Sequence, residues 1–145
     1  MPAAMTSNSA EDRHAISDAL AEYAYRWDRK DAAGFADLFT DDASMVWVLG
    51  GTPVDETVQG RADIEAYAAR AHAERIGNRQ SRHFFSNVIV RELGATTATT
   101  ENMLLVTHQA PGEQPLVKTT GTYRIEWARV DERWLIAERT LYVDR

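Results

Sequence analysis

Three residues of this sequence could together carry out proton-transfer chemistry: Asp28, His83 and His108. A neutral imidazole can remove a proton near pH 7, and a carboxylate can fix its tautomer and favour its charged form. A covalent mechanism has little support, because the chain has no cysteine and no Gly-x-Ser-x-Gly motif. The side-chain types therefore favour general acid–base catalysis.

Asp28 ends a helical pattern that runs from about residue 10 to about residue 29. Because Asp28 follows Ala24 by four positions and Leu20 by eight, it extends the apolar face of this helix. A carboxylate on that face is costly unless it is paired or hydrogen-bonded. Asp28 either turns into water at a frayed helix end or enters a pocket and orients a histidine.

The two histidines lie on consecutive predicted strands. Side chains alternate along a strand, so His83, Phe85 and Asn87 share one face, and His108 ends the next strand among apolar neighbours. A single histidine of this kind is more often a satisfied core residue than a catalyst. Two such histidines, together with a carboxylate on an apolar helix face, favour a catalytic site.

A metal centre is a weaker interpretation of the same residues. Two histidines and one carboxylate could form a facial triad, but no close ligand spacing occurs in the sequence. The other histidines, His14 and His72, fit the exposed surface of helices. We therefore expect neither a metal nor an organic cofactor.

Further side chains could shape a pocket or contact a ligand in it. An apolar pocket with few polar groups suits an enolisable or hydroxylated ring compound. Ordinary core packing is the alternative for the aromatic residues, and ion pairing in solvent is the alternative for the arginine. The candidate substrate-binding residues are Tyr23, Trp27, Trp47, Phe85, Asn87 and Arg124.

The order of the elements predicts an α+β fold, because helical patterns fill the first half of the chain and strand patterns the second. Residues 1–9 are predicted to be a flexible N-terminus and residues 10–145 a single domain. Asp31 should cap a short helix that reaches Phe39, and Gly77 should end a helix that follows Gly60. The strands are expected at 44–49, 82–93, 97–110, 116–130 and 133–143.

Composition narrows the possible partners. The chain of 145 residues has a net charge of -6 and no basic cluster, which argues against nucleic acid and anionic membranes. The N-terminus lacks a signal-peptide pattern, and no apolar run approaches the roughly 20 residues of a membrane span. A cytoplasmic protein is expected.

Several segments together are similar to the SnoaL-like group of the nuclear transport factor 2-like (NTF2-like) superfamily. This resemblance implies a cone in which a curved, mainly antiparallel mixed sheet wraps around N-terminal helices and encloses an apolar pocket. It also implies a homodimer or homotrimer formed through the outer sheet face. The segments that carry it are residues 23–31, 38–43, 59–61, 81–84, 121–124 and 133–139.

Within that group, the polar residues most resemble those of scytalone dehydratases and bile-acid 7α-dehydratases. The resemblance implies that Asp28 holds His108, which acts as the base, while His83 assists the departure of hydroxide. Trp27 and Trp47 stand where scytalone dehydratases have carbonyl-polarising tyrosines, which Tyr23 could replace. Bile-acid enzymes have an aspartate at the position of His108, so the substrate is expected to be neither scytalone nor a bile acid.

The resulting hypothesis is a cofactor-independent lyase (a dehydratase) or isomerase that acts on a small cyclic hydroxy-ketone or steroid-like compound. One competing hypothesis is a non-catalytic module of the same fold that binds a hydrophobic ligand or mediates association. A polyketide ring cyclase and an epoxide hydrolase also share the fold, but the additional carboxylates of the hydrolase cannot be placed. The superfamily also contains small subunits of ring-hydroxylating dioxygenases, but the iron ligands of that reaction have no counterpart in this sequence.

Overall fold

A computed structural model describes residues 9–54 and 56–145 of the chain. The predicted N-terminal segment 1–9 lies outside the described residues, apart from Ser9, which begins the first helix. The helices are α1 (Ser9–Asp28), α2 (Ala32–Ala36), α3 (Arg61–Arg70) and the π-helix η1 (Ala71–Ile76). The strands are β1 (Phe39–Leu49), β2 (Thr52–Pro53), β3 (Val58–Gln59), β4 (Gln80–Leu93), β5 (Thr97–Gln109), β6 (Leu116–Val130) and β7 (Arg133–Val143).

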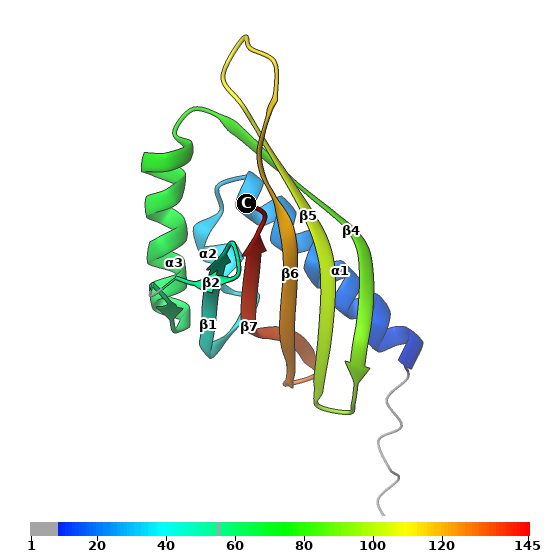
Figure 1. Cartoon of the computed structure of the whole chain (residues 1–145). Helices are drawn as coiled ribbons and strands as arrows, with labels where there is room; N and C mark the ends of the chain where they lie inside the picture. The colour runs from blue at the N-terminus through cyan, green and yellow to red at the C-terminus, as the bar shows by residue number, and fades with distance from the viewer. Residues whose placement is uncertain (1–8, 55) are drawn as a thin grey trace, which may run out of the picture.

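The strands form one mixed sheet with the order β2-β1-β7-β6-β5-β4, and β3 pairs with β1. Strands β4 to β7 form an antiparallel meander, whereas β1 runs parallel to β7. Figure 1 shows the helices on one side of the curved sheet and the β5–β6 hairpin extending beyond it. The predicted α+β cone with a curved, mixed sheet is confirmed, and the sheet is not closed.

The prediction for the short helix and the strand after it was wrong at their junction. Helix α2 ends at Ala36, and Phe39 is already the first residue of β1. Ile136 on β7 donates its backbone N–H to Leu38 and pairs with Phe39. The pairing with β7 determines that Phe39 is in a strand. This pairing cannot be predicted from the spacing of apolar residues around Phe39. The predicted helix stop at Gly77 is confirmed, with a left-handed φ of 58°.

The apolar face of α1 packs into the core of the cone. Tyr23 and Phe35 are both buried, and their ring centroids lie 4.8 Å apart. Burying a side chain of this size contributes roughly 1.5–3 kcal/mol to stability. The same helix face continues past Trp27 to Asp28, so the packing of α1 determines where that carboxylate lies. Among the described residues, none of the helices combines the length and apolar character of a membrane span.

Candidate functional site

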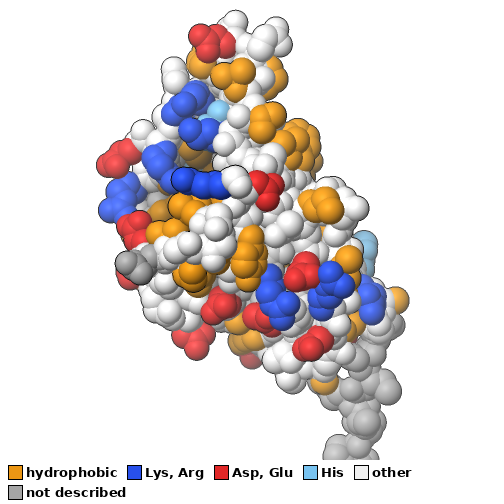
Figure 2. Space-filling model, viewed as in Figure 1, with side chains coloured by type: hydrophobic (Ala, Val, Ile, Leu, Met, Phe, Trp, Pro, Cys, Tyr) orange, Lys and Arg blue, Asp and Glu red, His pale blue; other side chains and the backbone are white. Residues whose placement is uncertain are grey.

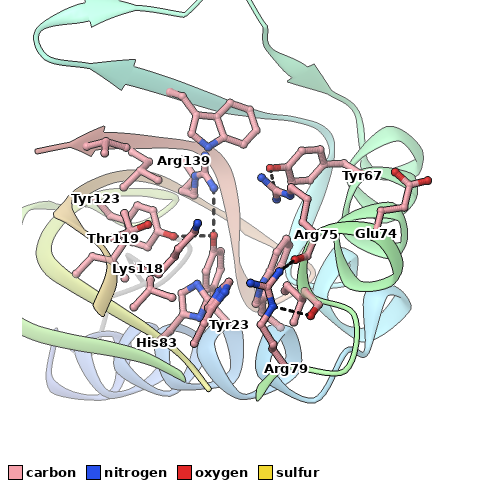
Figure 3. Close-up of a pocket in the computed structure, with 18 residues that line it drawn as sticks. Tyr23, Tyr67, Glu74, Arg75, Arg79, His83, Lys118, Thr119, Tyr123 and Arg139 are labelled. Carbon is pink, nitrogen blue, oxygen red and sulfur yellow. Dashed lines mark hydrogen bonds between the residues drawn. The ribbon is translucent and has the colours of Figure 1, made fainter. Parts of the chain in front are cut away.

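A cavity of about 580 Å³ lies between the sheet and the helices α1, α3 and η1. This volume falls within the range typical of small-molecule sites. His83 and His108 both line the cavity, together with Tyr23, Trp27 and Trp47 of the predicted pocket residues. Figure 3 shows side chains from the sheet and from the helices converging on the cavity.

Asp28 and His83 form a buried pair at one side of this cavity. Asp28 Oδ1 lies 2.8 Å from His83 Nδ1, and the two side chains are 7% and 10% exposed. Asp28 also accepts hydrogen bonds from Ser81 Oγ at 2.7 Å and from the backbone N–H of His83 at 2.8 Å. Because the carboxylate accepts the Nδ1 proton, the imidazole keeps Nε2 as its acceptor atom.

The expected partnership between Asp28 and His108 was wrong, because Asp28 holds His83 instead. The end of α1 lies against the start of β4, which brings Asp28 to Ser81 and His83. His108 lies one strand further away and is paired in register with Ser81. The two histidines therefore line the same cavity, but only His83 is held by the carboxylate.

His108 has a different electrostatic environment. Burial, and then the positive charges of Arg79 and Lys118, lower the pKa of His108 below its usual value, with a smaller opposing effect from Asp28. Its Nδ1 atom is buried and finds no hydrogen-bond partner among the described residues. His108 is consequently a neutral imidazole at pH 7.

Arg139 is a cavity residue that the sequence analysis missed. Its side chain is only 4% exposed, and its guanidinium donates to Tyr23 Oη and to the Val46 carbonyl, each at 3.3 Å. It lies 4.7 Å from the centroid of the Trp47 ring and 5.3 Å from that of Tyr123. Alternation along β7 could have indicated this position, since Arg139 shares a face with the cavity residue Leu141.

The two tyrosines beside Arg139 form a polar end of the cavity. Tyr23 Oη and Tyr123 Oη lie 3.2 Å apart, and both rings are buried. Burial raises the pKa of Tyr123 well above its usual value, so this phenol stays neutral. Tyr23 therefore presents a hydroxyl on the α1 face, as predicted.

Two predicted ligand contacts lie outside the cavity. Asn87 is exposed and has a φ of 54°, because a β-bulge between Ser86 and Ile89 breaks the alternation that linked it to His83. Arg124 is 45% exposed and pairs with Glu126 at 3.2 Å. Both assignments to the pocket were wrong.

Phe85, His14 and His72 were also singled out in the sequence, and the structure places them in different surroundings. Phe85 packs against Tyr23 and Tyr123, with centroids 5.7 and 5.5 Å apart, and supports the cavity wall. His14 is exposed, as predicted. His72 was predicted to be exposed but is 6% exposed, because η1 turns its ring onto Trp27 at 4.6 Å.

Positive side chains surround the opening of the cavity. Arg75, Arg79 and Lys118, hereafter the mouth cations, line the cavity and are exposed or half-buried. Figure 2 shows Lys and Arg side chains gathered around a hollow lined by hydrophobic side chains. Within residues 9–54 and 56–145, no group of three or more His, Cys, Asp or Glu side chains is arranged to hold a metal ion.

Comparison with known proteins places this architecture in a family. The model of the SnoaL-like domain matches residues 8–140. No curated protein matches the chain.

Solved structures share the fold over nearly the whole chain. Aln2 from a Streptomyces species is 28% identical, with a TM-score of 0.78 over 92% of this chain and 91% of that one. A variant of Rv3472, a protein of unknown function from Mycobacterium tuberculosis, is 26% identical, with a TM-score of 0.77 over 92% and 77%. A scytalone dehydratase candidate from Novosphingobium aromaticivorans is 22% identical, with a TM-score of 0.78 over 96% and 88%, and shows the fold alone.

Proposed function

Because the chain belongs to the SnoaL-like domain family, we propose that it is a cofactor-independent lyase or isomerase acting on a small cyclic hydroxy-ketone or steroid-like compound. This fold includes dehydratases, isomerases and ring cyclases. One observation carries the proposal of acid–base chemistry: a buried Asp28–His83 pair at the wall of a largely apolar cavity. An association module would need neither the cavity nor the burial of Asp28.

The proposed reaction begins with His83. Its Nε2 atom takes a proton from the carbon next to a carbonyl, and the C–H electron pair forms an enolate. Asp28 stabilises the imidazolium that results, because an opposite charge favours the protonated ring. His108, a neutral imidazole, donates an N–H hydrogen bond to the enolate oxygen, a role in which a neutral ring is effective.

The second half of the reaction returns the proton from His83. In a dehydration the enolate re-forms the carbonyl, a C=C bond forms, the C–O bond breaks, and the imidazolium protonates the departing hydroxide to give water. In an isomerisation the same proton goes to another carbon. One histidine held by Asp28 thus serves both reactions, and the roles of His83 and His108 are reversed from those implied by the resemblance.

Turnover of 3-hydroxycyclohexanone and of 5-androstene-3,17-dione tests this proposal, because each yields a conjugated enone that absorbs ultraviolet light. His83→Asn keeps a side-chain N–H for Asp28 but removes the base. We expect it to reduce the rate about 10²–10⁴-fold. Ser86→Ala, at an exposed position on the same strand, is the matched control and should leave the rate unchanged. Equal rates for His83→Asn and the unmodified protein would contradict the assignment.

A further inference from the structure

Arg139 is a buried cation, and none of the described residues balances its charge. No Asp or Glu in the described part of the chain lies within ion-pair distance of its guanidinium, and its Nε atom is buried without a hydrogen-bond partner. An isolated buried charge is strongly unfavourable unless a partner compensates it. We propose that the compensating partner is a carboxylate of the ligand, which binds Arg139 at the inner end of the cavity.

The described neighbours of Arg139 do not supply the missing negative charge. Tyr123 stays neutral because burial raises its pKa well above the usual value. Burial lowers the pKa of Arg139, yet its net shift is upward, and a guanidinium is not deprotonated in proteins, so Arg139 stays charged. Of its five N–H donors, those engaged reach only a phenol and a carbonyl, both at 3.3 Å.

The shape of the Arg139 site suits a carboxylate. The guanidinium carbon lies 4.7 Å and 5.3 Å from the ring centroids of Trp47 and Tyr123, and Arg139 lines the cavity in which a ligand would lie. A guanidinium edge binds a carboxylate through two parallel hydrogen bonds. Tyr23 and Tyr123, whose hydroxyl groups meet beside it, add one further donor, because one of the two O–H groups donates in the bond between them.

The charge at the opening of the cavity favours the same ligand. The protein has a net charge of -6, yet the mouth cations Arg75, Arg79 and Lys118 share the cavity lining with a single acidic residue, Glu74. Like-signed charges around a cleft raise the local concentration of oppositely charged ligands. An anionic ligand would therefore be attracted at the opening and held at the inner end. Figure 3 shows Lys118, Arg79 and Arg139 among the side chains around the cavity.

The position of the carboxylate relative to His83 limits the size of the ligand. Val106, the partner of His83, pairs with Thr119, and Tyr123 lies four residues further along β6. The backbone positions of His83 and Tyr123 are therefore offset by roughly 13 Å along the strand direction. A ligand of one or two fused rings spans much of this distance. The inferred class is thus a cyclic carboxylic acid, with the acid group at Arg139 and the reacting carbon near His83. The placement of the reacting carbon near His83 rests on the proposed function, whereas the anion site at Arg139 does not.

Binding of 2-naphthoate and 2-naphthamide to the full chain, measured by calorimetry at pH 7, tests the inference. These probes share a shape and differ in charge. We expect the unmodified protein to bind naphthoate at least tenfold more tightly than the amide, and Arg139→Met to abolish that preference. Arg124→Met, which removes an arginine from outside the cavity, is the control and should keep the preference. Sodium chloride and sodium phosphate test whether a free inorganic anion occupies the site instead.

Three results would overturn the inference: equal affinity of the unmodified protein for both probes, a preference retained in Arg139→Met, or saturation by an inorganic anion that naphthoate cannot displace. If Arg139→Met does not fold, the affinities of the unmodified protein for naphthoate and naphthamide still test whether the site prefers a carboxylate. His83→Asn should still prefer naphthoate. If His83→Asn loses turnover but neither this variant nor the unmodified protein prefers naphthoate over the amide, a carboxylic acid ligand is rejected and the acid–base proposal stands.

Discussion

At the residue scale, the cavity combines an acid–base pair at one side with a buried cation at its inner end. The Asp28 carboxylate is held by Ser81 and by the backbone of His83, so the imidazole has one defined orientation. Arg139 is held by rings and neutral oxygens, with no carboxylate among its described partners. The first arrangement suits the proposed role of His83 as a base, and the second suits the proposed binding of a carboxylate.

Replacing Asp28 by asparagine tests how the carboxylate works. The new amide can present N–H to His83 Nδ1, which would place the ring proton on Nε2 and remove the acceptor atom from the cavity. We expect Asp28→Asn to reduce turnover about 10²-fold or more, as loss of the correct tautomer does in other histidine-dependent enzymes. Nitrogen NMR of the histidine rings should show the tautomer change. Unchanged turnover in a folded Asp28→Asn protein would contradict the orienting role of Asp28.

His72 should make stability depend on pH. Burial, followed by the charge of Lys30, lowers its pKa below 6.5, so the unfolded chain takes up the proton more readily than the folded one. The contribution of His72 to the free energy of unfolding is therefore fully present above about pH 6.5, and it is lost as the pH falls below that value. Both ring nitrogens lack partners among the described residues, so His72→Phe should stabilise by about 1 kcal/mol.

Thermal unfolding between pH 5 and pH 8 measures this effect. The change of the unfolding temperature with pH should be smaller in His72→Phe than in the unmodified protein. Part of the change should remain, because the pKa of His108 is also lowered. His14→Phe, at an exposed position, is the control and should keep the full slope. A slope that is the same in all three proteins would contradict the role of His72.

At the element scale, the packing of β6 against β7 determines the position of Tyr123 and Arg139. Gly121 faces Val143 in this pair, and a Cβ at Gly121 would collide with the backbone carbonyl of Tyr142. The two strands can approach only because Gly121 lacks a side chain.

Gly121→Ala is therefore expected to destabilise the protein by about 1–3 kcal/mol, as overpacking does elsewhere. It should also weaken naphthoate binding, because the strands would separate at the cavity wall. Denaturant unfolding measures the first effect. Gly94→Ala is the matched control, since a Cβ there would lie at an ordinary 3.5 Å from the Thr97 carbonyl. Equal stability of the two variants would contradict the packing argument.

Much of the element pattern can be predicted from spacing, and its exceptions have physical causes. The apolar face of α1 and the alternation around His83 and His108 identified both strands and the helix-borne carboxylate. The bulge that exposes Asn87 and the pairing that starts β1 at Phe39 depend on partner strands far away in the sequence. Which histidine Asp28 holds is likewise decided by how α1 packs on β4.

At the scale of the whole molecule, the outer sheet face is a candidate for self-association. Phe84 and Met103 are 53% and 52% exposed, and Phe84 pairs in register with the exposed Leu105. Contiguous exposed apolar side chains commonly mark association surfaces. We propose that this face forms the homodimer or homotrimer expected from the sequence.

Light scattering after size-exclusion chromatography tests that proposal. The unmodified protein should elute as a dimer or trimer, and Met103→Lys should shift it towards the monomer, because a charge would be buried in the interface. Val130→Lys, which adds the same charge at another exposed apolar position, should not. A monomeric unmodified protein would reject self-association.

The central claim is that the His83 imidazole held by Asp28 removes a proton from a carbon next to a carbonyl. Hydrogen–deuterium exchange of 2-tetralone in D₂O, followed by proton NMR, measures this step without any later chemistry. We expect the protein to accelerate exchange next to the carbonyl, His83→Asn to reduce this acceleration to the buffer rate, and Ser86→Ala to retain it. Exchange that is equally fast with His83→Asn, or no faster than in buffer with the unmodified protein, would contradict the account.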